Sequence, residues 1–429
     1  MKTSTATTRT GNARNGAARH GAAHHEPVAL PATGASELVA GQVTTLPACR
    51  LDGPESCRLE PGGVVPSVQP LAEHLRRRVI GQERAVEPLV RALQRSLAGL
   101  NDPARPLLTA LLLGPTGVGK TETAKALAGG LLGAESALTR IDCEEYAHGF
   151  ELSKLLGSPP GYIGFNVEPL LSQERIDAGH ARLRERRSDR GAPGEPSSPI
   201  AAMADRLAGD GGRLSILLFD EIEKASPKLW SALLGVLDDG RLTLGDNRTT
   251  DFTRSVILMT TNVGSRSIGE LLEAPRLGFD LASDGGRRER EPERVREAAL
   301  DAARQHFPAE FLNRFDEQLV YEPLGADDLV GIFDRMLADL QARVLERSGV
   351  PFLLKVSDAA RSLLVERGAD SRYGARPLRR VIETEIVGAL SEFIAAGAVA
   401  EGDVVEVLAG EDDRLTFVRG PRETTAVVS

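Results

Sequence analysis

A run of glycine, lysine and threonine near residue 114 has the residue types and the spacing of a phosphate-binding loop. Residues 114–121 read GPTGVGKT, which fits the pattern G-x-x-x-x-G-K-[ST]. The loop contains Gly114, Pro115, Thr116, Gly117, Val118 and Gly119. Its glycines let the backbone turn several N–H groups toward one anion. We expect Lys120 to bind the terminal phosphates of ATP and Thr121 to bind Mg²⁺.

Two acidic residues and an amide follow apolar runs farther along the chain. LSILLFDE at 214–221 ends in Asp220 and Glu221, and SVILMTTN at 255–262 ends in Asn262. An apolar strand that ends in two carboxylates, downstream of a phosphate loop, is typical of the partner that completes a Mg²⁺ site and activates water. We expect Asp220 to share Mg²⁺ with Thr121, Glu221 to act as general base and Asn262 to orient the water.

A parallel sheet is needed to bring these residues together. Apolar runs at 107–113, 138–142, 214–221 and 255–262 predict strands, and a helical pattern of apolar residues follows the phosphate loop. Alternation of strand and helix predicts an α/β fold, with a parallel sheet between helices on both faces. Ligands of such sheets bind at the carboxyl ends of the strands, where the phosphate loop also lies.

Composition is that of an ordinary globular chain with a polar first segment. The chain has 429 residues, 41% of them hydrophobic, which is enough for a sizeable core. We predict a disordered low-complexity tail at 1–70, in which Cys49 and Cys57 lack the second pair that a zinc site needs. A formal charge of −9 disfavours nucleic-acid binding. Apolar runs are too short for a membrane span or a secretory leader, so we expect a cytoplasmic protein.

The alternation of predicted strands and helices changes near residue 324, where a second domain is expected to begin. We predict a large ATPase domain at 71–323, with a charged, proline- and glycine-rich surface insertion at 166–213. Helical segments at 327–347, 357–367 and 375–396 frame short strands near 352–356 and 403–408. These segments predict a separate small, mostly helical α+β domain at 324–420, followed by a tail at 421–429.

An aromatic residue stands among glycines at 157–165, GSPPGYIGF. The Pro-Pro pair and the glycines predict a mobile or exposed loop. Taken alone, the ring of Tyr162 is better explained as packing beneath that loop.

The order of the motifs resembles one known family. VIGQ (79–82), GPTGVGKT, GSPPGYIGF, LLFDEIEKASP (217–227), VLDDGRLT (236–243), MTTN (259–262), FLNRFDE (311–317) and YGARPLRR (373–380) occur in this order. Together they resemble the Clp/heat-shock unfoldases of the AAA+ class, and specifically the second ATPase ring of ClpA, ClpB and ClpC. The resemblance runs from about residue 71 to 420.

Further roles are implied by this resemblance. Arg314 is similar to the arginine finger that reaches the γ-phosphate bound by a neighbouring subunit. Arg376 is similar to the sensor-two arginine of the small domain, and Val79 and Ile80 to residues that flank adenine. Tyr162 is similar to the aromatic that grips an unfolded polypeptide in a central pore. A finger that acts between subunits implies a closed ring, and the family implies a homo-hexamer.

The same resemblance also implies partner proteins. Leu277, Gly278 and Phe279 are similar to the loop that docks onto a ClpP-type peptidase, which would link the motor to proteolysis. We expect no peptidase activity in the chain itself. We expect residues 1–70 to form neither an adaptor domain nor a first ATPase ring. This expectation favours an alternative function, an ATP-gated assembly factor that remodels one dedicated partner. A nucleic-acid motor is disfavoured, since the aromatic loop has no basic companions.

Overall fold

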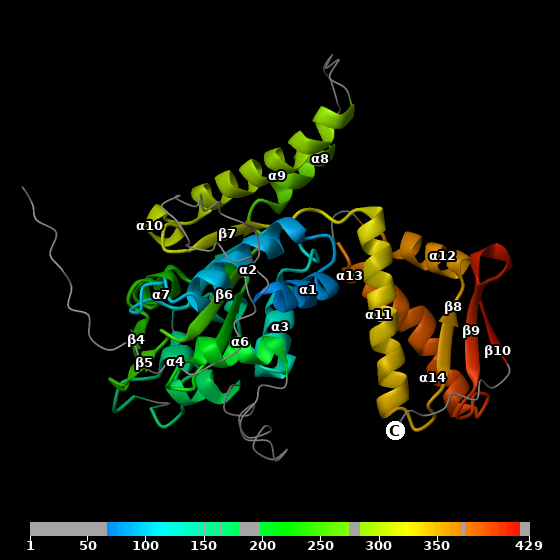
Figure 1. The fold of residues 1–429 in the computed structure, drawn as a ribbon, viewed down its shortest axis with the longest axis horizontal. Helices are drawn as coiled ribbons and strands as arrows, with labels where there is room; N and C mark the ends of the chain where they lie inside the picture. The colour runs from blue at the N-terminus through cyan, green and yellow to red at the C-terminus, as the bar shows by residue number, and fades with distance from the viewer. Residues whose placement is uncertain are drawn as a thin grey trace, which may run out of the picture. The chain divides into compact units, whose positions relative to one another are not determined.

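The computed structural model describes residues 67–149, 151–162, 165–179, 198–273, 284–370 and 374–420. It contains the predicted parallel sheet (Figure 1). The five strands of this sheet run in the order β2-β3-β6-β1-β7. The strands are β1 (Leu108–Leu113), β2 (Thr139–Asp142), β3 (Ser215–Asp220), β6 (Ser255–Thr261) and β7 (Glu317–Val320). All four pairings are parallel, so every strand ends at the same edge of the sheet.

Side chains of the central strands alternate between two cores. In β1, Leu112 belongs to one hydrophobic cluster, whereas Leu111 and Leu113 belong to the other. Every position of β1, β3 and β6 is buried, as expected for central strands of a sheet that is covered on both faces.

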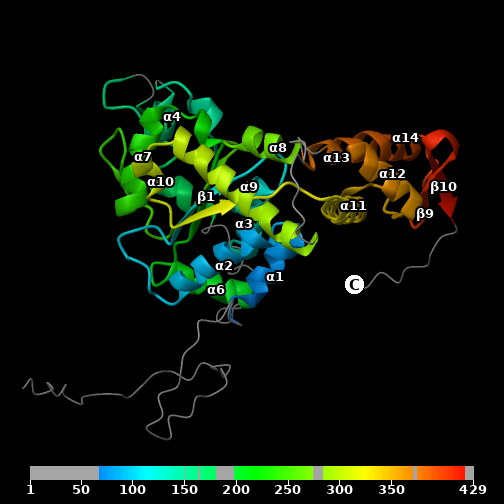
Figure 2. The same cartoon turned by 90° about the horizontal axis from the view of Figure 1, so that it is seen from above.

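Helices cover each face (Figures 1 and 2). The first cluster is completed by α1 (Gln69–Arg78), α2 (Glu83–Leu97), α3 (Lys120–Leu131) and α6 (Pro199–Ala208). The second is completed by α4 (Leu152–Leu156), α7 (Pro227–Asp239), α8 (Ser265–Glu273), α9 (Asp284–His306) and α10 (Ala309–Leu312). Short 3-10 turns lie at Glu135–Ala137, Cys143–Tyr146 and Ile222–Lys224, and a hairpin of β4 (Arg241–Thr243) and β5 (Thr249–Asp251) follows α7.

Residues beyond β7 build a third hydrophobic cluster of their own, around Phe333, Leu364 and Ile386. Its helices are α11 (Ala326–Arg347), α12 (Asp358–Gly368), α13 (Arg376–Val381) and α14 (Gly388–Ala395), with a π-helical turn at Ile382–Val387 and a 3-10 turn at Glu411–Asp413. Its strands β8 (Leu353–Val356), β9 (Val404–Ala409) and β10 (Leu415–Gly420) form a separate sheet.

Several predicted elements differ from those in the structure. The helix expected at 375–396 is interrupted by the π-helical turn at Ile382–Val387. Strand β10 and the β4–β5 hairpin were not predicted, because short strands with weak apolar alternation give little signal in a sequence.

The predicted surface insertion at 166–213 is too wide. Leu171 and Ile176 are buried, and α6 inserts Met203, Ala204 and Leu207 into the first hydrophobic cluster. Residues of this range on both sides of the segment 180–197 therefore contribute to the core. Most of the charged, proline- and glycine-rich run at 188–199, which suggested an insertion, lies outside the described residues, as do residues 1–66 and 421–429.

Within the part of the chain that the structure describes, no helix is both long and apolar enough to cross a membrane.

Replacing Leu258 by alanine tests the central core. Leu258 is fully buried and lies between Ala110 of β1 and Leu218 of β3. We expect Leu258→Ala to lower the free energy of unfolding by about 2–5 kcal/mol, through lost burial and the cavity left behind. Leu100, which is 82% exposed, provides the matched control, and Leu100→Ala should change stability by about 0.5 kcal/mol or less. Equal effects of the two variants in denaturant titrations would contradict this core.

Candidate functional site

The glycine-rich loop connects β1 to α3 at the carboxyl edge of the sheet. Gly119, at the N-terminus of α3, has φ of 111°, which a residue with a side chain rarely adopts. Gly114 has φ of 146°, and a Cβ there would lie 2.6 Å from the carbonyl oxygen of Tyr321. Glycine is therefore required at both positions for the loop to close around the start of the helix.

Lys120 is the buried cation of this edge. Its Nζ donates to the carbonyl oxygens of Gly114 and Pro115, both at 2.6 Å, and to Oδ1 of Asn262 at 3.0 Å. Burial lowers the pKa of Lys120 to about 8, against the opposing charges of Glu223, Asp220 and Glu221. The loop thus holds a partly desolvated ammonium group among acidic side chains.

Asp220 and Thr121 meet beside this lysine. The hydroxyl of Thr121 lies 3.2 Å from Oδ1 of Asp220. Asp220 also accepts a hydrogen bond from Thr260 Oγ1 at 2.5 Å, and Arg140 forms an ion pair with it at 2.7 Å. Thr260 and Arg140 therefore fix the direction of the carboxylate.

Glu221 follows in a left-handed backbone conformation, with φ of 56°. Its N–H donates to Thr260 Oγ1 at 3.0 Å, and its Oε1 accepts from Nδ2 of Asn262 at 3.2 Å. Its Oε2 pairs with Lys224 at 2.6 Å. This hydrogen bond raises the pKa of Lys224. The structure therefore brings together Lys120, Thr121, Asp220, Glu221 and Asn262.

These residues fit a nucleotide with Mg²⁺. A hydroxyl and a carboxylate within 3.2 Å of each other are the hard oxygen ligands that Mg²⁺ prefers. Backbone N–H groups at the start of α3, together with Lys120, suit phosphate oxygens. Glu221 and Asn262 lie at the same edge, where a carboxylate and an amide could bind one water molecule.

Val79, Ile80 and Arg376, which the resemblance implicates in nucleotide binding, lie outside the sheet. Val79 is buried, and its Cγ1 lies 3.4 Å from the position that a Cβ of Gly119 would occupy, while Ile80 faces Gly331 of α11. Ala375 donates its N–H to the carbonyl oxygen of Gly117 at 3.1 Å. Arg376, the next residue, is exposed, and its charge contributes to the lowered pKa of Lys120.

Arg314 lies apart from the cluster of residues around Lys120. Its guanidinium forms an ion pair with Asp238, near the end of α7, at 2.7 Å, and its side chain is 39% exposed. Its carbonyl oxygen accepts hydrogen bonds from Arg105 and Thr109. None of these partners belongs to the nucleotide site of the same chain.

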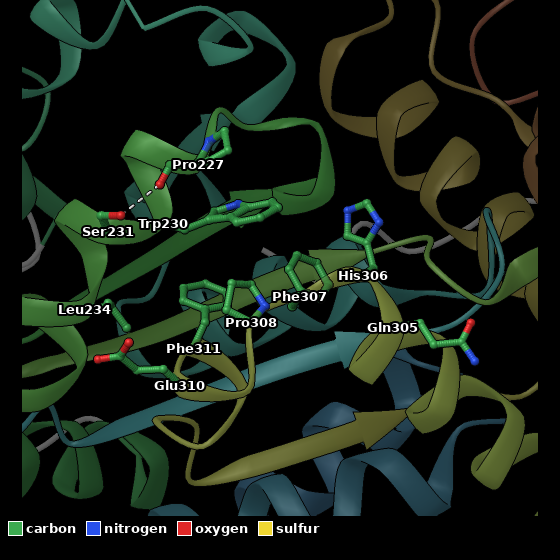
Figure 3. A pocket seen from close by; sticks show the side chains of 10 residues that line it. All are labelled: Pro227, Trp230, Ser231, Leu234, Gln305, His306, Phe307, Pro308, Glu310 and Phe311. Carbon is green, nitrogen blue, oxygen red and sulfur yellow. Dashed lines mark hydrogen bonds between the residues drawn. The ribbon is translucent and has the colours of Figure 1, made fainter.

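An open pocket of about 520 Å³ lies between α7 and residues 305–311 (Figure 3). The indole of Trp230 faces the rings of Phe307 and Phe311, with centroids 5.3 and 6.2 Å apart (Figure 3). The pocket includes no residue of the nucleotide site. Its aromatic rings join α7 to α10, the two helices beside Arg314.

Tyr162 is 71% exposed, so it does not pack beneath its loop. Phe165 and Val167 are 41% and 65% exposed. The base of the loop is anchored, because Gly245 donates its N–H to the carbonyl oxygen of Leu156 at 2.8 Å. Leu277, Gly278 and Phe279 lie outside the described residues, as does Tyr373.

Comparisons with known proteins agree with this arrangement. A family model described as AAA domain (Cdc48 subfamily) matches residues 105–177 and 199–318. A second, the C-terminal D2-small domain of ClpB protein, matches residues 324–407. The chain belongs to the Clp branch of the AAA+ family. Its fold and family are those that the sequence predicted.

Relatives include Chaperone protein ClpB 1 of Thermosynechococcus vestitus, 39% identical over 349 residues, which are 81% of this chain and 34% of the relative. ClpB of Meiothermus ruber is 38% identical over 332 residues, 77% of this chain and 33% of the relative. The Clp-type chain thus spans about a third of the length of these relatives.

A solved structure is similar too, a closed-state reconstruction of Hsp104 with ATPγS and FITC casein. It has a TM-score of 0.61 and 28% identity, and the match covers 82% of this chain and 52% of that one.

Four residues of this Clp-type site were not predicted. Arg140 and Thr260 hold Asp220, Lys224 holds Glu221, and Glu223 accepts the N–H of Asn262 at 2.9 Å. Lys224 and Glu223 lie within LLFDEIEKASP, but nothing in that motif tells which of its charged residues point inward.

Replacing Lys120 tests the nucleotide site. We expect Lys120→Met to weaken binding of a fluorescent ADP analogue by about tenfold to a hundredfold, because a charged hydrogen bond to phosphate is worth about 1.5–3 kcal/mol. Lys125→Met, on the same helix, is the control and should bind like the wild type. A dissociation constant that is unchanged in Lys120→Met would rule out the proposed position of the phosphates.

Proposed function

We propose that this chain hydrolyses ATP and uses the energy to remodel other polypeptides by threading them through the pore of a ring. The observation that carries the proposal is Tyr162, which is 71% exposed on an anchored loop of the domain that holds the nucleotide site. A motor that acts on many sequences needs bulk without specific readout, which an exposed aromatic provides.

Each residue of the site has a role in this proposal. Lys120 and the loop N–H groups bind the phosphates, Thr121 and Asp220 bind Mg²⁺, and Val79 and Ile80 flank the adenine. Mg²⁺ neutralises charge that develops on the phosphate oxygens. Glu221 removes a proton from the attacking water, which Asn262 orients, and Arg376 reports the nucleotide state from the small domain. Lys224 must leave Glu221 partly free for this, which its exposure allows.

The position of Arg314 supports the assembly of several copies of the chain into a ring. Its partly exposed guanidinium is paired with Asp238 and lies away from its own nucleotide site, as expected of a residue that completes the site of a neighbouring copy. Contacts of that kind are head-to-tail and close into a ring, which we propose to be a homo-hexamer. We also propose the division into a large domain, 71–323, and a small domain, 324–420.

Docking onto a ClpP-type peptidase gains no support from the comparisons, because the relatives named above are ClpB chaperones and Hsp104. The alternative, an assembly factor that remodels one dedicated partner, shares the same nucleotide site. It differs in its client, and two experiments separate it from a threading motor.

The first experiment replaces Tyr162. We expect Tyr162→Ala to slow ATP-dependent unfolding of a stable fluorescent protein by about tenfold or more, because every subunit of the ring loses its aromatic contact. ATP turnover should stay within about twofold of the wild type, since the loop is separate from the nucleotide site. Tyr162→Phe is the matched control and should retain unfolding. If Tyr162→Ala unfolds the protein as fast as the wild type does, threading past this residue is wrong.

The second experiment uses Glu221→Gln, which removes the base and retains a side chain of the same shape. We expect it to bind ATP but turn it over at about a hundredth of the normal rate or less, since general base catalysis contributes about 10²–10⁴-fold. Proteins that co-purify with this variant in ATP identify the client. Many unrelated clients support the unfoldase, and a single stoichiometric partner supports the assembly factor. Normal turnover would refute the role of Glu221.

A further inference from the structure

Glu223 is a partly buried carboxylate to which neither the motif nor the function proposed above assigns a role. It lies in the 3-10 turn after β3, two residues beyond Glu221. Its Oε1 accepts the main-chain N–H of Asn262 at 2.9 Å. Its Oε2 is fully buried and has no hydrogen-bond partner among the residues that the structure describes.

The backbone explains why a side chain is needed here. Regular pairing of β3 with β6 ends at Phe219 and Met259. Glu221 then turns away with φ of 56°, so the main chain of the turn no longer continues the ladder beside β6. A partly buried N–H at Asn262 would cost free energy without an acceptor, and the carboxylate of Glu223 supplies one.

Asn262 connects this hydrogen bond to the reacting groups. Its Oδ1 accepts from Nζ of Lys120 at 3.0 Å, and its Nδ2 donates to Oε1 of Glu221 at 3.2 Å. The amide thus joins the phosphate-binding lysine to the general base. Because its main chain is held by Glu223, a shift of this carboxylate would move both contacts.

The unpaired oxygen indicates that Glu223 is retained for more than packing. A buried carboxylate with one free oxygen is costly unless opposite charge lies close by. Lys120 provides that charge, and the carboxylate in turn balances the buried ammonium group. An apolar residue of similar size would avoid this cost and would neither hold Asn262 nor balance Lys120.

We propose that Glu223 is a positioning residue for ATP hydrolysis, which holds Asn262 so that its amide stays in contact with both Lys120 and Glu221. The inference rests on the function proposed above, because it assumes hydrolysis at this site. Glu223 acts through Asn262 and makes no contact with the reacting atoms.

Steady-state ATPase kinetics of full-length variants test this role. Glu223→Ala should lower kcat by about tenfold, as expected for the loss of one charged hydrogen bond, and leave the dissociation constant of a fluorescent ADP analogue within about threefold of wild type. Glu223→Gln, whose amide oxygen can accept the same N–H, should recover most of the lost kcat. Glu270→Ala, at an exposed position of α8, is the control and should behave like the wild type.

A double-mutant cycle with Asn262→Ala separates positioning from a merely structural effect. If Glu223 acts through Asn262, the double variant should be no slower than Asn262→Ala alone. If the alanine variant does not fold, Glu223→Asp replaces it, because the shorter carboxylate keeps the charge and falls short of the Asn262 N–H.

The results that would refute the role of Glu223 differ from those that would refute the proposed ATPase function. Independent, multiplicative losses in the cycle, or a Glu223→Gln variant as slow as Glu223→Ala, would show that Glu223 does not act through Asn262. Normal kcat in Glu223→Ala, with an active wild type, would overturn this inference alone. A wild-type chain that hydrolyses no ATP would overturn both.

Discussion

The parallel register of β1, β3 and β6 is the constraint on which the candidate site depends. β6 lies between the other two strands, and its register with each places Thr261 beside Leu113 at the end of β1 and Met259 beside Phe219 of β3. The glycine-rich loop, the two carboxylates and the amide of Asn262 therefore leave the sheet side by side. Neither helices nor loops need to be long to bring them together, because the sheet does so.

Charge balance at this edge follows from burial. Lys120 is almost fully buried, and a desolvated ammonium group is tolerated only among opposite charges. Asp220, Glu221 and Glu223 provide them, while Arg140 and Lys224 approach the first two from the more exposed side. Removal of one member leaves its partners with an uncompensated charge, so these residues are expected to act as a unit rather than additively.

Helix α7 connects the carboxyl edge of the sheet with the region around Arg314. It begins three residues after Lys224, at Pro227, and near its end Asp238 pairs with Arg314. Aromatic contacts of Trp230 with Phe307 and Phe311 fix the helix against the segment that leads to Arg314. The edge that carries the candidate site and the proposed arginine finger thus share one packed helix. A rigid element of this kind is what coupling between neighbouring subunits would require.

The sequence by itself determined the loop, the fold class and the family, because these depend on local patterns: glycine and lysine at fixed spacing, and apolar runs that end in polar residues. It misjudged residues 166–213, since a charged run conceals the flanking residues that pack in the core. Only the tertiary structure decided that Glu223, Thr260 and Arg140 complete the site. Their partners are distant in the chain, as with Lys120 and Asn262, which lie 142 residues apart, and their side-chain directions depend on strand pairing and on the turn at Glu221. A motif specifies which residue types are present, whereas their contacts depend on how the whole sheet packs.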